Sequence, residues 1–202
     1  MAKVSSTEAQ NNWVVMRAFF EETKLVHQHL DSYNDFIGNK LQRIITEVGK
    51  IQPDIHNRTA KRPLSQFYLR LGQLTIESPS IREADGSKKP IYPNEARVRD
   101  LTYSSPLFLE MTPVDVDRKT GIEEQLEPVN IYIGELPVML KSKVCLLAGL
   151  SDDELVTQGE DPNDPGGYFV INGSERVLVT QEDLAPNRVL VEETRRSSTS
   201  TH

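Results

Sequence analysis

The chain has 202 residues, 37% of them hydrophobic, and a formal net charge of -7. This length is enough for one domain with a core, or for one domain and part of another, and no apolar run approaches the roughly 20 residues that cross a bilayer. The acidic balance argues against free-standing nucleic-acid binding, which usually relies on a net basic face. The single cysteine, Cys145, excludes an internal disulfide, predicts a small buried hydrophobe and fits a cytoplasmic location.

The N-terminal quarter predicts two helices. Residues 1–8 are polar and expected to be disordered. Residues 9–22 contain several large apolar side chains and no breaker, which suits a helix with much buried surface. Gly49 is expected to cap a second helix, and Gly38 inside that helix would allow a close helix approach. The second helix is predicted by apolar residues three and four apart, namely Leu30, Tyr33, Ile37, Leu41, Ile44 and Val48.

The middle of the chain predicts strands. Residues 66–78 and 107–116 read as two of them, and alternating apolar residues predict a third at 129–133. Residues 79–91 are rich in turn formers and predict an exposed turn region. Between these, Pro93 can begin a short helix with an acid in its first turn.

The C-terminal third predicts a helix, a hairpin and a tail. Ser151 and Glu154 have the spacing of a capping box. The acidic residues between 152 and 164 could hold a metal but more often form a solvated face, so no metal site is predicted. Asn172-Gly173 is the strongest short signal for a two-residue hairpin turn, followed by expected strands at 176–181 and 187–193.

Four stretches carry a family resemblance. Residues 164–182 read DPGGYFVINGSERVLVTQE, and residues 25–37 read LVHQHLDSYNDFI. Residues 92–110 read YPNEARVRDLTYSSPLFLE, and residues 134–145 read GELPVMLKSKVC. Taken in chain order, they resemble the second-largest subunit of multi-subunit RNA polymerases, and the QEDLAPN that begins at Gln181 is similar to the archaeal form.

The resemblance implies a fold and an enzyme. The fold is α+β, with N-terminal helices packed on a mixed, mainly antiparallel sheet. Residues 9–194 would form the N-terminal portion of the protrusion domain, which would lack its C-terminal return and leave a sheet edge unfilled. Residues 195–202 would lead towards a lobe domain. The enzyme is DNA-directed RNA polymerase, a nucleotidyltransferase that uses magnesium. This chain alone is expected to hold no cofactor and no catalytic residue.

The resemblance also implies contacts with the DNA–RNA hybrid and upstream DNA in the polymerase cleft. Arg176 and Gln181 are the leading candidates, with Glu175 in support. Ion pairing with nearby acids such as Glu95 and Asp100 is the alternative for the two arginines at 97 and 99. The complete set of candidate nucleic-acid-binding residues is Arg176, Gln181, Glu182, Asn187, Lys141, Lys143, Arg97 and Arg99. The implied partners are the other polymerase subunits, DNA, RNA and general initiation factors, and no membrane.

Two other functions are weighed against this one. A protein-interaction module would dock polymerase subunits or initiation factors without touching nucleic acid. Basic side chains clustered on one concave face would favour the cleft wall, whereas scattered side chains paired with acids would favour the interaction module. A phosphate-binding enzyme built on Pro165-Gly166-Gly167 is disfavoured, because that loop precedes a predicted strand and not a helix N-terminus.

Overall fold

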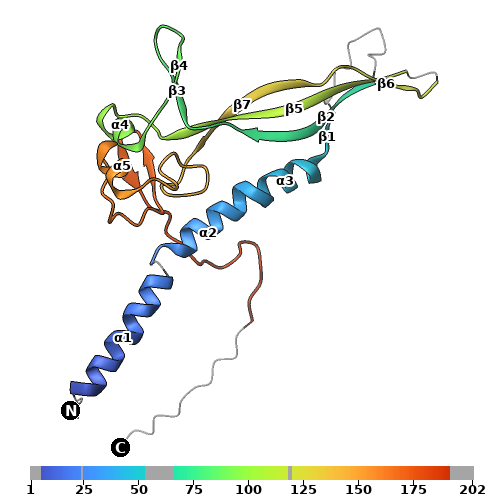
Figure 1. The fold of residues 1–202 in the computed structure, drawn as a ribbon. Coiled ribbons are helices and arrows are strands. Elements are labelled where there is room, and N and C mark those ends of the chain that lie inside the picture. Colours follow the sequence, from blue (N-terminus) through green and yellow to red (C-terminus); the bar gives the residue numbers. More distant parts are fainter. Residues whose placement is uncertain (1–5, 24, 53–65, 118–119, 192–202) are drawn as a thin grey trace, which may run out of the picture.

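A long antiparallel sheet and a smaller unit at one end of it make up most of the fold (Figure 1). The structure is a computed structural model that describes residues 6–23, 25–52, 66–117 and 120–191. A helical segment runs along the sheet, and helix α1 projects away from it. The expected α+β class is confirmed. No helix among these described ranges is long and apolar enough to cross a membrane.

Strand β5 (Ser104–Val116) lies at the centre of the sheet. It pairs with β2 (Gln66–Ile76) on one side, and β1 (Lys50–Ile51) pairs with β2 in turn. On its other side β5 pairs first with β7 (Val129–Pro137) and, further along, with β6 (Glu123–Gln125). All these pairings are antiparallel.

The three strands predicted in the middle of the chain are confirmed, with shifted ends. The central strand begins three residues earlier than predicted, and the strand predicted at 129–133 continues to Pro137. The acidic strand β6 was not predicted because its EEQ sequence has no apolar alternation. Residues 79–91 were expected to be a turn region. They contain a short hairpin, β3 (Ser80–Arg82) with β4 (Lys88–Pro90).

The hairpin predicted around Asn172-Gly173 is confirmed. Strands β8 (Phe169–Ile171) and β9 (Ser174–Arg176) flank a turn whose central residues have φ of 47° and 73°. The predicted strand at 176–181 is wrong beyond Arg176, and residues 187–191 form no strand. Apolar alternation alone is insufficient, because a strand also needs a neighbour to accept its backbone hydrogen bonds. Residues 192 and 193 of that prediction lie outside the described part.

Helix α1 (Ser6–Glu22) confirms the first predicted helix but not its environment. It begins at Ser6, so residues 6–8 are helical where disorder was expected, and residues 1–5 lie outside the described ranges. The expected burial is wrong: Trp13 is 69% exposed and Phe19 is 56% exposed. The reason is visible in Figure 1, where α1 extends away from the sheet.

The second predicted helix has three parts, α2 (His27–Asp35), the wider π-helical turn η1 (Phe36–Lys40) and α3 (Leu41–Val48). Gly49 caps it as expected, with φ of 65° and a hydrogen bond from its N–H to the carbonyl of Ile45. The close approach expected at Gly38 is wrong for the described residues, because none of their atoms outside the helix's own backbone and the two chain neighbours of Gly38 lies within 4 Å of the position of an added Cβ.

Polar side chains, among them Tyr33 and Gln42, join the helical segment of residues 27–48 to the rest of the structure. The buried Tyr33 hydroxyl donates a 2.6 Å hydrogen bond to the carbonyl of Pro137, at the end of β7. The Gln42 amide reaches the β2 bulge, where its nitrogen donates to the Gly72 carbonyl and its oxygen accepts from the Leu74 N–H at 2.8 Å. The bulge leaves backbone groups without ladder partners, and the Gln42 side chain satisfies two of them.

The main hydrophobic cluster lies beside the sheet in what we call the compact end, residues 91–103 and 138–176. The compact end contains α4 (Pro93–Val98), α5 (Asp152–Thr157) and the hairpin β8–β9. Cys145 is buried there, as predicted, and burial raises its pKa. The buried cluster consists of Ile91, Ala96, Tyr103, Val138, Leu140, Cys145, Leu147, Leu155 and Val170.

Candidate nucleic-acid interface

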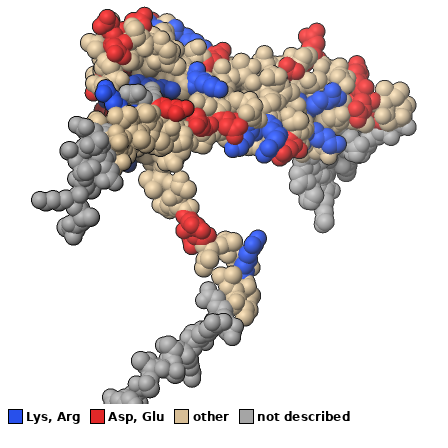
Figure 2. Space-filling view, turned by 60° about the horizontal axis from the view of Figure 1, so that its bottom comes forward, with Lys and Arg blue, Asp and Glu red and all other residues tan. Residues whose placement is uncertain are grey.

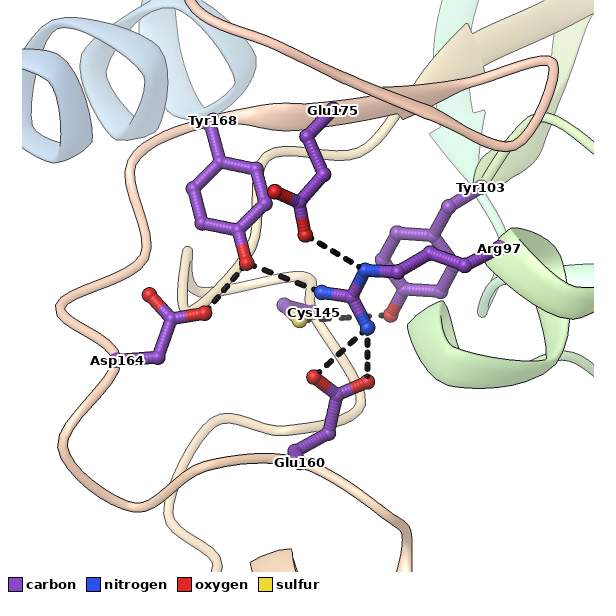
Figure 3. Close-up of polar contacts among 7 residues, drawn as sticks. All are labelled: Arg97, Tyr103, Cys145, Glu160, Asp164, Tyr168 and Glu175. Carbon is purple, nitrogen blue, oxygen red and sulfur yellow. Dashed lines mark hydrogen bonds and ion pairs between the residues drawn. The ribbon is translucent and has the colours of Figure 1, made fainter.

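An ion-paired group of side chains, the Arg97 junction, joins three separate segments of the compact end (Figure 3). The Arg97 Nη1 donates to both Glu160 carboxylate oxygens, at 2.9 and 3.0 Å. The Nε donates to Glu175 at 2.9 Å, and Nη2 donates to the Tyr168 hydroxyl at 3.0 Å. Tyr168 in turn donates to the Asp164 carboxylate. The junction therefore ties α4 to the loop after α5 and to the hairpin β8–β9.

Burial makes this junction electrostatically strong. The Glu160 side chain is 4% exposed and the Arg97 side chain is 21% exposed, so little water screens the pair. Burial lowers the pKa of the Arg97 guanidinium, but the hydrogen bond and charge of Glu160 outweigh it and the net shift is upward. Burial and the bond to Asp164 raise the pKa of Tyr168, so its hydroxyl remains protonated and donates.

The residues that begin and end helices α4 and α5 determine where Arg97 and Glu160 lie. Pro93 begins α4, so Arg97 falls in its last turn, facing the loop that contains Glu160. Helix α5 begins with the predicted capping box, since the Ser151 hydroxyl accepts from the Glu154 N–H and the Glu154 carboxylate accepts from the Ser151 N–H. Where α5 ends, the Glu160 N–H bonds to the Leu155 carbonyl at 2.9 Å.

The hairpin β8–β9 is seated on residues 100–103. The Tyr103 N–H donates to the Val170 carbonyl at 3.0 Å, and the Gly173 N–H donates to the Leu101 carbonyl at 2.9 Å. At Gly173, which has φ of 73°, an added Cβ would lie 2.6 Å from Asp100 Oδ1 and 2.9 Å from its Cα. Glycine is required at this position, and the turn is held closely against the end of α4.

Arg99 also takes part in ion pairs. Its Nη1 lies 2.8 Å from a Glu83 carboxylate oxygen and 2.6 Å from one of Glu95. The hydrogen bond from Arg99 lowers the pKa of Glu83. The predicted partner Glu95 is thus confirmed for Arg99. The prediction named the wrong acids for Arg97, whose partner Glu160 is 63 residues away in sequence and could not be read from local spacing.

The two candidate lysines lie in a series of turns and not in an extended segment. The ammonium group of Lys141 donates to the carbonyls of Pro162 and Asp164. Lys143 is exposed, and its backbone N–H donates to Asn34 Oδ1 at 2.9 Å. Two residues two positions apart share a face only in an extended segment, so the turns described here do not place Lys141 and Lys143 together in that way.

The remaining candidates Gln181, Glu182 and Asn187 are exposed in the segment after β9, and Arg176 is exposed at the end of that strand. Arg176 also borders an apolar groove of about 470 Å³. The other groove residues are Ser32, Tyr33, Phe36, Leu136, Pro137, Met139, Phe169, Ile171, Val177 and Leu178.

Basic side chains are not gathered on the face shown in Figure 2. Lys and Arg there are interspersed with Asp and Glu along the body of the molecule. On the compact end, Arg97 and Arg99 are likewise paired with acids. Basic side chains that are scattered and paired with acids are the arrangement that favours the interaction module. In the segment from Arg176 to Val191 all four candidate residues, Arg176, Gln181, Glu182 and Asn187, are exposed.

These features define an α+β domain whose compact end contains a largely buried ion pair and is followed by an exposed segment. The family model described as RNA polymerase beta subunit matches residues 24–191, and the chain belongs to this family. The predicted resemblance to the second-largest polymerase subunit is therefore confirmed.

Three relatives illustrate the similarity. The chain is 52% identical over 180 residues to DNA-directed RNA polymerase subunit Rpo2N of Methanocaldococcus jannaschii, covering 89% of this chain and 34% of the relative. It is 48% identical over 198 residues to subunit Rpo2 of Saccharolobus shibatae, and this match covers 98% of the chain and 16% of the relative. It is 46% identical over 186 residues to Rpo2N of Methanococcus vannielii, and this match covers 92% of the chain and 35% of the relative. The chain thus spans about a third or about a sixth of these relatives.

Proposed function

We propose that this chain serves as part of the protrusion domain of an archaeal DNA-directed RNA polymerase. In this role it lines the cleft and contacts the DNA–RNA hybrid and upstream DNA. Its membership of the RNA polymerase beta subunit family carries the proposal. The partners are the other polymerase subunits, DNA, RNA and general initiation factors, and the site of action is the cytoplasm.

Magnesium chemistry belongs to other parts of the enzyme in this proposal. Among the described residues, no group of three or more His, Cys, Asp or Glu side chains is placed to hold a metal ion. In this proposal the chain contributes a non-catalytic wall of the cleft. Its part in nucleotidyl transfer is to hold the nucleic acid in place.

The exposed segment after the hairpin makes the contacts. Arg176, Gln181 and Asn187 are exposed and can reach a phosphate backbone. Arg97, Arg99 and Lys141 already bond to acids or carbonyls within the domain, so they have less capacity for an external partner. Contacts of this type would be independent of base sequence and would weaken with salt.

Salt resistance of elongation complexes tests the proposal. Assembled polymerase with Arg176→Ala or Gln181→Ala should remain intact, and its elongation complexes should dissociate at lower salt than those of the unmodified enzyme. The matched control is Arg43→Ala, which removes an exposed arginine from α3. Unchanged salt resistance in both variants would contradict nucleic-acid contact by this segment.

The interaction module is the second candidate function, favoured by two observations. Basic side chains on the compact end pair with acids, and α1 exposes Trp13 and Phe19. If the domain mainly docks proteins, Trp13→Ala with Phe19→Ala should release polymerase subunits or initiation factors during purification. Arg176→Ala would then leave salt resistance unchanged. Retention of all partners by the α1 double variant would argue against this function.

A further inference from the structure

We propose that Arg97 is a positioning residue for Arg176 and acts through Glu175. In this arrangement Arg97 fixes strand β9, and β9 fixes the direction in which Arg176 points. The inference rests on the proposed function, in which Arg176 contacts the nucleic-acid backbone. It changes the role expected for Arg97 from direct contact with a phosphate to support of another residue.

The first step is the anchoring of Arg97. All three nitrogens of the Arg97 guanidinium donate here, Nη1 to both oxygens of Glu160, Nε to Glu175 and Nη2 to Tyr168. Because the guanidinium is planar, three partners in different directions fix its orientation as well as its place. Because Glu160 is almost fully buried, the guanidinium is held at a defined place relative to the core of the compact end.

The second step is the attachment of β9. This strand has three exposed residues, and among the described strands it pairs only with β8. The bond from Arg97 Nε to Glu175 links its middle residue to α4. Without that bond, β9 would be attached to the domain mainly through its own hairpin.

The third step is geometric. Successive side chains of a strand point to opposite faces, so Glu175 facing Arg97 directs Arg176 to the other face. There Arg176 lies opposite Phe169 in the β8–β9 register and borders the apolar groove. Phe169 packs edge-on against Tyr33, with ring centroids 5.6 Å apart. Arg176 thereby lines the groove between the hairpin and the helical segment that contains α2.

If Arg97 instead contacted a phosphate directly, the affinity for nucleic acid would depend differently on salt concentration. A residue that neutralises a phosphate contributes about one to the slope of log affinity against log salt. A positioning residue changes affinity by a similar factor at every salt concentration and leaves the slope unchanged. The slope therefore separates the two roles.

Glu175→Ala in assembled polymerase is the central variant. The Glu175 side chain is 57% exposed, and Arg97 keeps Glu160 and Tyr168, so folding should be preserved. We expect affinity for the hybrid-containing scaffold to fall about twofold to fivefold, the range of an exposed ion pair, with no change in slope. Removing a negative charge beside a polyanion would by itself raise affinity, so a fall reports lost positioning.

Three further variants complete the experiment. Arg176→Ala should reduce the slope by about one, and the double variant with Glu175→Ala should bind no more weakly than Arg176→Ala alone. Glu175→Gln keeps an acceptor for Arg97 Nε and should recover part of the affinity. Glu124→Ala on β6, at the far end of the sheet, is the charge-matched control and should not lower affinity (Figure 1).

The outcomes are distinguishable. If Arg176→Ala reduces the slope while Glu175→Ala leaves affinity unchanged or raised, the positioning role is overturned and nucleic-acid contact by Arg176 stands. Additive losses in the double variant would also overturn it, because residues acting through one another are not additive. If Arg176→Ala changes neither slope nor affinity, the proposed function fails, and the positioning role fails with it.

Discussion

The compact end and the segment of residues 177–191 differ in how they hold their side chains. In the compact end, charged residues meet partners from distant parts of the sequence, and Arg97 bonds to Glu160, Tyr168 and Glu175. In the segment after β9, apolar side chains such as Val189, which is 93% exposed, lie on the surface. The first region has an interior of its own, and the second has none within the described residues.

This difference separates residues that stabilise the fold from residues that would recognise a partner. Residues with internal partners contribute to the free energy of unfolding of this chain, so substituting them should change that free energy when the chain is measured alone. Residues of the exposed segment contribute little to that free energy, so any importance they have must be measured in the assembled enzyme. The predictions below test this division on the purified 202-residue chain, beginning with the largest effect.

Arg97→Ala should have the largest effect. It leaves the Glu160 carboxylate buried without its cation, and breaking a buried pair from one side costs about 3–5 kcal/mol. Urea denaturation should show this loss in the free energy of unfolding. Adding Glu160→Gln removes the unpaired charge and should recover part of it. Equal stability of the single and double variants would show that the pair is screened by water.

Gly166→Ala should cause the second largest loss of stability. Gly166 has φ of 73°, and an added Cβ would lie 2.6 Å from the carbonyl oxygen of Leu140, a backbone atom that cannot move aside cheaply. Gly86→Ala is the matched control, because Gly86 also has positive φ, of 84°, but open space around it. The left-handed backbone alone costs about 1–2 kcal/mol, so thermal denaturation should show a clearly larger loss for Gly166→Ala. Equal losses would contradict the close contact.

Glu83→Gln should have a smaller effect that depends on pH. Bonding to Arg99 lowers the pKa of Glu83 in the folded chain from its ordinary 4.5. Such a group stabilises the fold above its unfolded pKa, and the contribution is lost as pH falls through the lower folded value. The melting temperature of Glu83→Gln should therefore lie below that of the unmodified chain at pH 7. The two should converge well below pH 4.5. A difference that persists unchanged in acid would exclude ionisation as its cause.

Val189→Ala should have the smallest effect. Its side chain has no interior to leave, and exposed substitutions usually change stability by less than about 0.5 kcal/mol. The midpoint of urea denaturation should be unchanged. A loss above about 1 kcal/mol, comparable with burial of a methyl group or more, would show that the segment packs on the domain in solution.

The fold was predictable where short-range chemistry decides it. The capping box at Ser151, the turn at Asn172-Gly173 and the cap at Gly49 each depend on residues close in sequence, and all are confirmed. The two expected strands at the C-terminal end were wrong because alternation indicates which face a residue would take but not whether a partner strand exists. The same limit explains α1, whose apolar residues were expected to be buried.

The candidate site was predictable only in part. The motif around Arg97 was identified, but its partners Glu160 and Tyr168 could not be inferred, because 63 and 71 residues separate them from it. The acidic stretch that contains Glu160 was interpreted as a solvated face. The Glu160 side chain in that stretch is only 4% exposed, and the guanidinium of Arg97 from α4 forms an ion pair with it. Tertiary pairing of opposite charges leaves no periodic signal in the sequence.

The π-helical turn at residues 36–40 has a consequence for the angular phase of the helix. Each residue of an α-helix advances the side-chain direction by about 100°, and a wider turn contains one residue more than an α-helical one. This extra residue lets Tyr33 face β7 and Gln42 face the β2 bulge within one continuous helix. Deleting any one residue of 36–40 would restore regular winding and rotate one of these anchors out of reach. The number of residues between Tyr33 and Gln42 therefore sets the relative directions of these two side chains. A substitution within the turn keeps that number, so it cannot have the effect of a deletion.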